Sequence, residues 1–157
     1  MRAYADTSFV VALLAPHAGT GAAVDAYRRL RNPALFFTRF HEAEVMNALR
    51  LRAFMEGRGG SASQRAVARR ERGVAMARLK HYHTLGVLRR TVAEWDTVMD
   101  RVLELSEAHT ERVGSRTLDL IHVAAALLLG SEIFLTGDAR QARVAEGEGM
   151  KVVAVKL

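Results

Sequence analysis

Short apolar runs alternate with longer segments of helical periodicity along the whole of this 157-residue chain. Runs of three to five residues beside Gly, Pro or Asp are typical of strands, and apolar residues that recur every three or four positions are typical of helices. Strands separated by helices favour a parallel sheet sandwiched between helices, which is an α/β fold. We expect strands at residues 3–5, 34–38, 85–88, 132–136 and 151–155, and helices at residues 7–14, 25–31, 41–55, 63–80, 91–112, 118–129 and 138–148.

Two local patterns add detail to these elements. Thr91 and Glu94 have the spacing of a capping box, which predicts that a helix opens there. Val45, Leu49 and Phe54 recur near helical spacing, so we expect them on the buried side of one helix.

The length is that of one domain with a core large enough to be stable without cross-links. The stretch 57–63 is too short for an interdomain linker, so we expect a single domain over residues 1–157, with a basic helical segment at about 56–80. The chain has no cysteine, which excludes disulfides, cysteine-based zinc sites, a thiol nucleophile and iron–sulfur clusters.

The net charge of +6 is concentrated in one segment. Residues 50–90 hold eleven Lys and Arg but only two Glu, so this segment carries +9 and the rest of the chain carries −3. A basic excess favours a polyanionic partner such as nucleic acid. The alternative is a solvated helix face that binds nothing.

No targeting or membrane segment is expected. Asp6 lies where a signal peptide would need its apolar core. The longest apolar stretch, at 123–129, is far shorter than the ~20 residues of a membrane span. We therefore expect a cytoplasmic protein that does not contact a membrane.

Four carboxylates fall next to the ends of expected strands or at the starts of helices: Asp6, Glu44, Asp119 and Asp138. In a parallel sheet, the carboxyl ends of the strands face a common crevice. Each acid taken singly has an ordinary role as a helix cap, a partner of a helix dipole or a solvated side chain. Taken together, they would repel one another unless they shared a divalent cation. Oxygen ligands in a chain without cysteine favour Mg²⁺ or Mn²⁺ over zinc.

The motifs around these acids resemble those of PIN-domain ribonucleases, and most of all the VapC-type toxins of bacterial toxin–antitoxin pairs. The resemblance extends from Tyr4 to Val155, with the motifs in family order. The motifs are Asp6–Thr7–Ser8, Glu44 with Asn47–Ala48–Leu49, and the segments 119–126 and 134–140.

This resemblance implies a three-layer α/β/α sandwich with a central five-stranded parallel sheet, and cleavage of RNA at a Mg²⁺ or Mn²⁺ site. It implies that the four acids bind the metal, that Thr7 or Ser8 and Thr136 support them, and that the protein forms a homodimer and pairs with an antitoxin. The segment 56–80 is longer and more basic than the resemblance leads us to expect.

Phosphodiester hydrolysis needs an activated water and neutralisation of the phosphate, and a cation held by carboxylates provides both. We expect Asp6 and Asp119 to hold the metal directly, with Glu44 and Asp138 completing the shell. Because an acidic pocket repels RNA, affinity must come from cations elsewhere, and we expect it from the basic segment, including Arg69, Arg70 and Arg72.

Asn47 and His122 each have two interpretations, and Tyr82 has one. Asn47 either hydrogen-bonds a carboxylate or phosphate, or packs between helices. His122, three residues after Asp119, either touches the site or is a histidine at the edge of the core. Tyr82 is the one aromatic residue that we consider for stacking on a base.

Other enzyme classes lack a required residue. A haloacid-dehalogenase-type phosphatase needs a second Asp where Ser8 stands, a receiver domain needs a well-placed lysine, and a dinucleotide-binding fold needs a Gly-rich turn after the first strand. The alternative that stays open is a catalytically silent PIN-like module that binds RNA or a partner.

Overall fold

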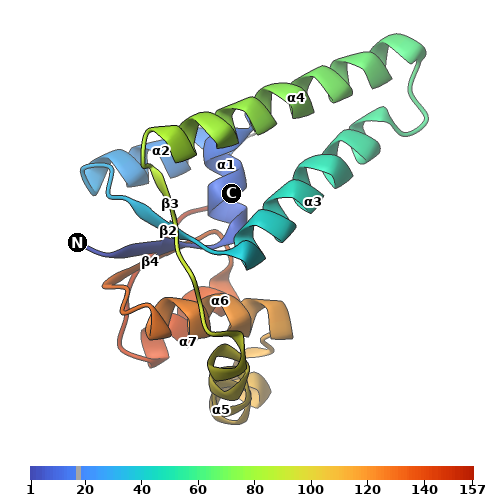
Figure 1. The fold of residues 1–157 in the computed structure, drawn as a ribbon. Helices are drawn as coiled ribbons and strands as arrows, with labels where there is room; N and C mark the ends of the chain where they lie inside the picture. The colour runs from blue at the N-terminus through green and yellow to red at the C-terminus, as the bar shows by residue number, and fades with distance from the viewer. Residues whose placement is uncertain (17–18) are drawn as a thin grey trace.

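The computed structural model describes residues 1–16 and 19–157 (Figure 1). The strands are β1 (Ala3–Ala5), β2 (Leu35–Phe37), β3 (Leu88–Arg90), β4 (Ile133–Thr136) and β5 (Lys151–Ala154). The helices are α1 (Thr7–Leu14), α2 (Thr20–Arg29), α3 (Arg39–Gly57), α4 (Ala62–Thr84), α5 (Trp95–Val113), α6 (Thr117–Leu128) and α7 (Ala139–Gly147).

The five strands form one parallel sheet in the order β3-β2-β1-β4-β5, as the alternation of apolar runs predicts. Tyr4 of β1 lies between Phe36 of β2 and Phe134 of β4. The chain adds β2 and β3 on one side of β1, and then returns to add β4 and β5 on the other side. The strand order therefore reverses between β1 and β4, which is the point where open α/β sheets form a crevice at the carboxyl ends of their strands.

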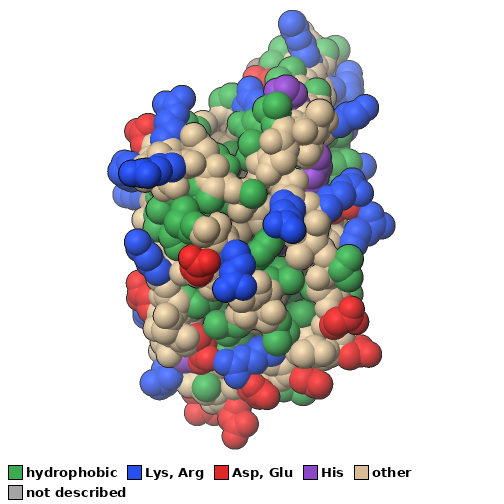
Figure 2. Space-filling view, turned by 60° about the vertical axis from the view of Figure 1, so that its left-hand side comes forward, with side chains coloured by type: hydrophobic (Ala, Val, Ile, Leu, Met, Phe, Trp, Pro, Cys, Tyr) green, Lys and Arg blue, Asp and Glu red, His purple; other side chains and the backbone are tan. Residues whose placement is uncertain are grey.

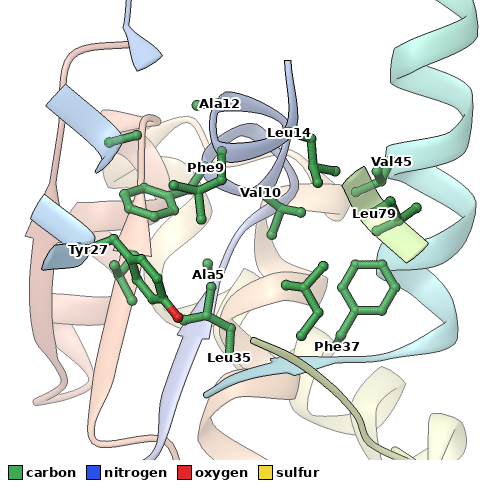
Figure 3. Close-up of a cluster of buried hydrophobic side chains, with 14 of the residues drawn as sticks. Ala5, Phe9, Val10, Ala12, Leu14, Tyr27, Leu35, Phe37, Val45 and Leu79 are labelled. Carbon is green, nitrogen blue, oxygen red and sulfur yellow. The ribbon is translucent and has the colours of Figure 1, made fainter. Parts of the chain in front are cut away.

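Alternation along the strands builds a core on each face of the sheet. Ala5, Leu35 and Phe37 face α1 to α4 and pack with their buried side chains (Figure 3). Tyr4 and Phe134 face the opposite way and pack with α5, α6 and α7. Full burial of a large apolar side chain contributes about 1.5–3 kcal/mol, so both helical layers are held to the sheet by this packing. The expected three-layer α/β/α sandwich is confirmed.

Helices α3 and α4 form an antiparallel hairpin whose outer end projects beyond the sheet (Figure 1). The 23 residues of α4 give it a length of about 34 Å. Its buried positions are Ala68, Ala75 and Leu79, which lie on one helical face and are mostly small. Small side chains allow two helices to approach closely. The Ser61 side chain caps α4 by accepting a hydrogen bond from the Gln64 amide.

The third strand begins three residues later and ends two residues later than the sequence predicts. The expected strand at 85–88 was wrong, because α4 continues to Thr84 and Leu85 closes it with 61% of its surface exposed. Gly86 then adopts a φ of +72°, a left-handed conformation that favours glycine and turns the chain toward β3.

The expected capping box at Thr91 and Glu94 is also absent. The Thr91 hydroxyl donates to the Arg89 carbonyl, and α5 begins at Trp95 with no side-chain hydrogen bond from Glu94, its N-cap. In α3, Val45 and Leu49 are buried as expected, but Phe54 is 60% exposed because it lies on the projecting part of the hairpin.

In the part of the chain that the structure describes, none of the helices has the length and apolar character needed to cross a membrane.

Candidate active site

All four predicted acids line one cavity of about 490 Å³. Asp6 follows β1 and Asp138 follows β4, so both lie where the strand order reverses. Glu44 reaches the cavity from α3, and Asp119 reaches it from the first turn of α6. Thr7 and Ser8 line it as well. The prediction that these side chains gather at the carboxyl edge of the sheet therefore agrees with the structure.

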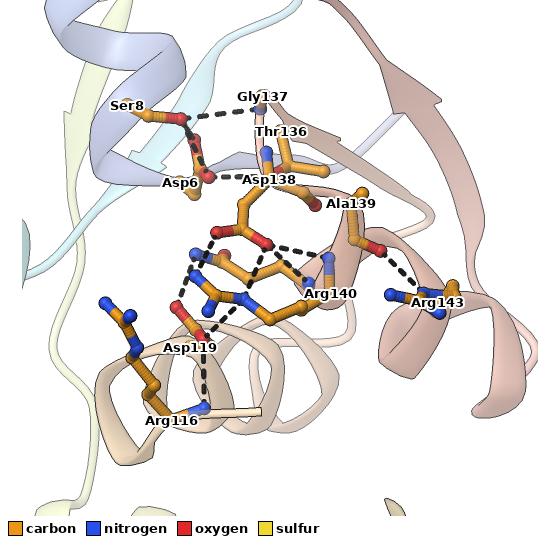
Figure 4. Close-up of polar contacts among 11 residues, drawn as sticks. Asp6, Ser8, Arg116, Asp119, Thr136, Gly137, Asp138, Ala139, Arg140 and Arg143 are labelled. Atoms are coloured by element: carbon orange, nitrogen blue, oxygen red, sulfur yellow. Dashed lines mark hydrogen bonds and ion pairs between the residues drawn. The ribbon is translucent and has the colours of Figure 1, made fainter. Parts of the chain in front are cut away.

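Asp6 is the most buried of the four acids, with 1% of its surface exposed. Its Oδ1 caps α1 by accepting from the Phe9 amide at 2.8 Å, and its Oδ2 accepts from the Thr136 hydroxyl at 2.6 Å. The Ser8 hydroxyl also donates to it (Figure 4). Burial raises the pKa of Asp6, and the neighbouring His122 and these hydrogen bonds offset only part of that effect. A cation beside Asp6 would stabilise its charged form.

Glu44 is held by a chain of hydrogen bonds from three elements. Its Oε2 accepts from the Thr7 hydroxyl at 2.6 Å and lies 2.7 Å from His122 Nε2. The other ring nitrogen of His122 lies 3.0 Å from the Tyr4 hydroxyl. Partial burial raises the pKa of Glu44, but the hydrogen bonds from His122 and Thr7 outweigh it and bring the pKa below its ordinary value. Glu44 is therefore ionised.

Asp119 and Asp138 share the guanidinium of Arg140. Arg140 NH2 lies 2.8 Å from Asp138 Oδ2, and its Nε lies 3.5 Å from Asp119 Oδ2 (Figure 4). Asp138 also caps α7 through the Arg140 and Gln141 amides. Burial raises the pKa of Asp138, but the hydrogen bonds from Arg140 lower it below its ordinary value. Gln141 Nε2 donates to Asp119 Oδ1 at 3.4 Å.

The supporting residues divide into two groups. Thr7 bonds Glu44, and Ser8 and Thr136 bond Asp6, as expected for residues that support the acids. Asn47 is exposed and has neither a hydrogen bond nor a place in the cavity wall among the described residues. Tyr82 is half-buried and packs against the core beneath α1 to α4, which is a packing role.

Arg140 and Gln141 were not predicted as site residues, and His122 fits both of its sequence-based interpretations. His122 is 2% exposed, so it is a core histidine and at the same time contacts Glu44. Arg140 and Gln141 follow Asp138 by two and three residues, within the first turn of the helix that Asp138 caps. That spacing is the available sequence signal for Arg140, whereas the contact of His122 with Glu44 depends on how α3 packs beside α6.

The chemistry of the site fits a hard divalent cation. Among residues 1–16 and 19–157, no three His, Asp or Glu side chains stand close enough together to hold a metal ion. Each of the four carboxylates is instead paired with a hydroxyl, His122 or Arg140. The four acids of the cavity nevertheless offer carboxylate oxygens, which are the ligands that Mg²⁺ and Mn²⁺ prefer. Gln141 Oε1 is a buried oxygen in the same wall without a hydrogen-bond partner in the described chain. A cation or its bound water would satisfy it.

The basic residues predicted to bind RNA lie outside this cavity. Arg69, Arg70 and Arg72 belong to the N-terminal half of α4, on the part of the α3–α4 hairpin that projects beyond the sheet (Figure 1).

The comparisons with known proteins place the chain in a family. No curated protein has a significant match to it. The family model described as PIN domain matches residues 3–147, which include all four acids and all but β5 of the sheet. A match over most of the length, together with the parallel sheet and the acidic cavity at its carboxyl edge, leads to one conclusion: the chain belongs to the PIN domain family.

Proposed function

We propose that this protein is a Mg²⁺- or Mn²⁺-dependent endonuclease that hydrolyses RNA phosphodiester bonds, with Asp6, Glu44, Asp119 and Asp138 as its metal-binding and catalytic acids. PIN domains are generally nucleases. The observation that carries the proposal is the convergence of four carboxylates from four separate elements on one cavity where the strand order reverses.

Within this proposal each residue has a separate task. When bound, the metal lowers the pKa of a water molecule and neutralises the scissile phosphate. Asp6 is held in one orientation by Thr136, Ser8 and the Phe9 amide, so its carboxylate needs no reorganisation to bind a cation. Glu44 uses Oε2 for Thr7 and His122, whereas its Oε1 has no hydrogen-bond partner in the described chain. We propose that Glu44 Oε1 orients the attacking water.

Asp119 and Asp138 complete the site from the other side. Both contact Arg140 in the structure, so part of their negative charge is offset without a metal.

The biological role that we propose is that of a VapC-type toxin in the cytoplasm, working as a homodimer and silenced by an antitoxin protein. The motif resemblance supports this role. Exposed apolar side chains, Leu51, Met55 and Val67 on the hairpin and Leu103 on α5, leave surface for protein partners. The alternative, a silent module that only binds RNA or a partner, is not favoured, because all four acids are present and gathered.

The deciding experiment is digestion of end-labelled RNA by the wild type and by Asp6→Asn, each with Mg²⁺, with Mn²⁺ and with a chelator. Asparagine keeps an Oδ1 acceptor for the Phe9 amide, so the cap of α1 and the fold are retained. We expect cleavage by the wild type that the chelator abolishes and added metal restores, and none by the variant. Equal cleavage by both proteins would identify a contaminating nuclease.

The toxin role needs its own test. Expression of the wild type should arrest growth of the host cells, expression of Asp6→Asn should not, and the product of a small adjacent reading frame should copurify with both proteins. Normal growth on expression of an enzyme that is active in vitro would remove the toxin role and leave the nuclease intact.

A further inference from the structure

The α3–α4 hairpin contains a second cavity, of about 410 Å³, whose charged lining residues are all arginines. The five arginines are Arg50, Arg58, Arg65, Arg69 and Arg72. Figure 2 shows Lys and Arg side chains on the projecting upper part of the molecule, while Asp and Glu gather at the opposite end. The charge separation in the sequence is therefore also a separation in space.

These five arginines lie around one cavity without an acidic partner among the described residues, whereas six other arginines of the protein form ion pairs. Arg52 is paired with Glu56, Arg101 with Glu104, and Arg140 with Asp138. None of the five cavity arginines forms an ion pair with any described residue. Arg72 Nε is buried and has no hydrogen-bond partner in the described chain. Unpaired like charges around one cavity repel one another, and an anion there would relieve the repulsion and supply the missing acceptor.

One aromatic side chain completes the cavity wall. Phe54, which is 60% exposed, lines it beside the arginines. Guanidinium groups bind phosphates, and an exposed aromatic ring stacks on an unpaired base, so their combination is typical of sites for single-stranded nucleic acid. An acidic protein segment would offer carboxylates to the arginines, whereas a single-stranded nucleic acid offers both phosphates for the guanidinium groups and unpaired bases for the ring.

We propose that this cavity binds the backbone of single-stranded RNA a few nucleotides from the scissile bond, with Phe54 stacking on one base. The inference rests on the proposed nuclease function and adds to it the place where the rest of the substrate is held. It retains Arg69 and Arg72 from the sequence-based prediction, adds Arg50, Arg58 and Arg65, and excludes Arg70, which does not line the cavity.

The geometry of α3 sets the distance between the two cavities. Glu44 and Ala48 line the acidic cavity, and Arg50 and Phe54 line the arginine cavity. At 1.5 Å per residue, Glu44 and Phe54 are about 15 Å apart along the helix axis. At about 100° per residue, exposed Asn47 lies between them around the helix. Stacked nucleotides advance about 3.4 Å each, so about four to six nucleotides separate the two sites.

Binding is measured first, in the Asp6→Asn background, so that it does not depend on cleavage. The probe is a fluorescent 20-nucleotide single-stranded RNA, titrated at several salt concentrations. We expect Arg69→Glu and Arg58→Glu each to weaken binding about tenfold and to reduce the salt slope. We expect Phe54→Ala to weaken binding at least about fivefold with the slope unchanged. Arg70→Glu makes the same charge change one residue from Arg69, and we expect less than about threefold.

Cleavage then tests the spacing, in proteins that retain Asp6. With a 4-nucleotide RNA, which cannot reach both cavities, Arg69→Glu should cleave as fast as the wild type, whereas with the 20-nucleotide RNA it should be about tenfold slower.

Several results would overturn the inference. Equal losses from Arg69→Glu and Arg70→Glu would mean that diffuse charge holds the RNA. Unchanged RNA binding in all variants, or loss of binding to a protein partner instead, would make the cavity a protein surface. If the wild type does not cleave RNA but the binding pattern appears as expected, the nuclease proposal fails and the RNA site stands.

Discussion

His122 Nε2 lies 2.7 Å from Glu44 Oε2, although the two residues are 78 positions apart in the chain. The same carboxylate oxygen accepts from the Thr7 hydroxyl, and the Tyr4 hydroxyl lies at hydrogen-bond distance from the other ring nitrogen. Burial raises the pKa of Tyr4 well above its ordinary value, so Tyr4 remains a donor. With the Tyr4 hydroxyl donating to Nδ1, His122 donates from Nε2 to Glu44. The central strand thus orients a carboxylate on α3 through a histidine on α6.

Replacing His122 should impair cleavage without removing a metal ligand. In His122→Phe the ring volume is nearly kept, but the donor to Glu44 is lost. We expect kcat for RNA cleavage to fall about 10- to 100-fold, the size seen when a partner that orients a metal-binding group is removed. The matched control is Tyr4→Phe, which removes one hydroxyl and should have a smaller effect. Unchanged kcat in a folded His122→Phe protein would assign the histidine to packing alone.

Divalent cations should stabilise the protein, in a way that does not depend on catalysis. Because burial raises the pKa of Asp6, keeping it ionised is unfavourable until a cation binds. At 100 times its Kd, a cation adds about 2.7 kcal/mol to the free energy of unfolding, a rise of roughly 5 to 10 °C in Tm. Thermal unfolding with and without Mn²⁺ measures this. Asp6→Asn should reduce the rise strongly, and an equal rise in both proteins would place the cation elsewhere.

Arg140 and a cation should compete for the same two carboxylates. Arg140 contacts Asp138 at 2.8 Å and Asp119 at 3.5 Å. In Arg140→Gln these acids keep their charge but lose the guanidinium that offsets part of it. We therefore expect a lower Tm without metal, and Mn²⁺ binding that is tighter by about threefold or more. Calorimetric titration of both proteins gives the affinities. Weaker Mn²⁺ binding in the variant would show that the guanidinium assists the cation.

The stability of the protein should fall as the pH falls below about 6.5, because of His41. Burial, with the nearby His122, lowers the pKa of His41 to about 3. Its Nε2 donates to the Ala5 carbonyl, and its Nδ1 accepts from the Thr38 amide and lies 3.0 Å from the Thr38 hydroxyl, so both ring nitrogens are already engaged in the neutral form. The unfolded chain binds a second ring proton at about pH 6.5 and the folded chain does not. The stability is therefore complete above pH 6.5 and decreases as pH falls toward 3.

Between pH 3 and pH 6.5 the free energy of unfolding changes with pH by up to about 1.4 kcal/mol per pH unit because of His41. Urea unfolding at pH 7.5, 6 and 5 measures it, and His41→Gln, which cannot be protonated in this range, should be less stable at pH 7.5 but should have a flatter profile. Parallel profiles for the two proteins would contradict this origin.

The sequence predicts the sheet and the acids well because both depend on local patterns. Apolar runs identified four of the five strands closely, and Asp6 and Asp138 lie next to their strands, so their places follow from the sheet rule. The third strand was misplaced because Leu85 closes α4 and Gly86 makes a left-handed turn, so the pairing with β2 begins only at Val87, whose carbonyl accepts from the Leu35 amide.

The contacts between elements could not be read from the sequence. Glu44 meets His122 because α3 and α6 cover opposite faces of the sheet and come together at its edge, which is a tertiary relationship. The arginine cavity likewise depends on how α3 and α4 pack: neighbours Arg69 and Arg70 are equivalent in the sequence, but only Arg69 lines the cavity.

The caps at the acidic cavity have a consequence for how such a protein could change over generations. Asp6 starts α1, Asp138 starts α7, and Asp119 accepts from the Arg116 amide at the start of α6. Loss of a cap by substitution with Ala destabilises a protein by about 1 kcal/mol, whereas Asn keeps the acceptor oxygen. A lineage that gave up catalysis but kept its fold would therefore accumulate Asn or Ser at these three positions, and Ala only rarely. An inactive descendant would still show in its sequence where the acids had been.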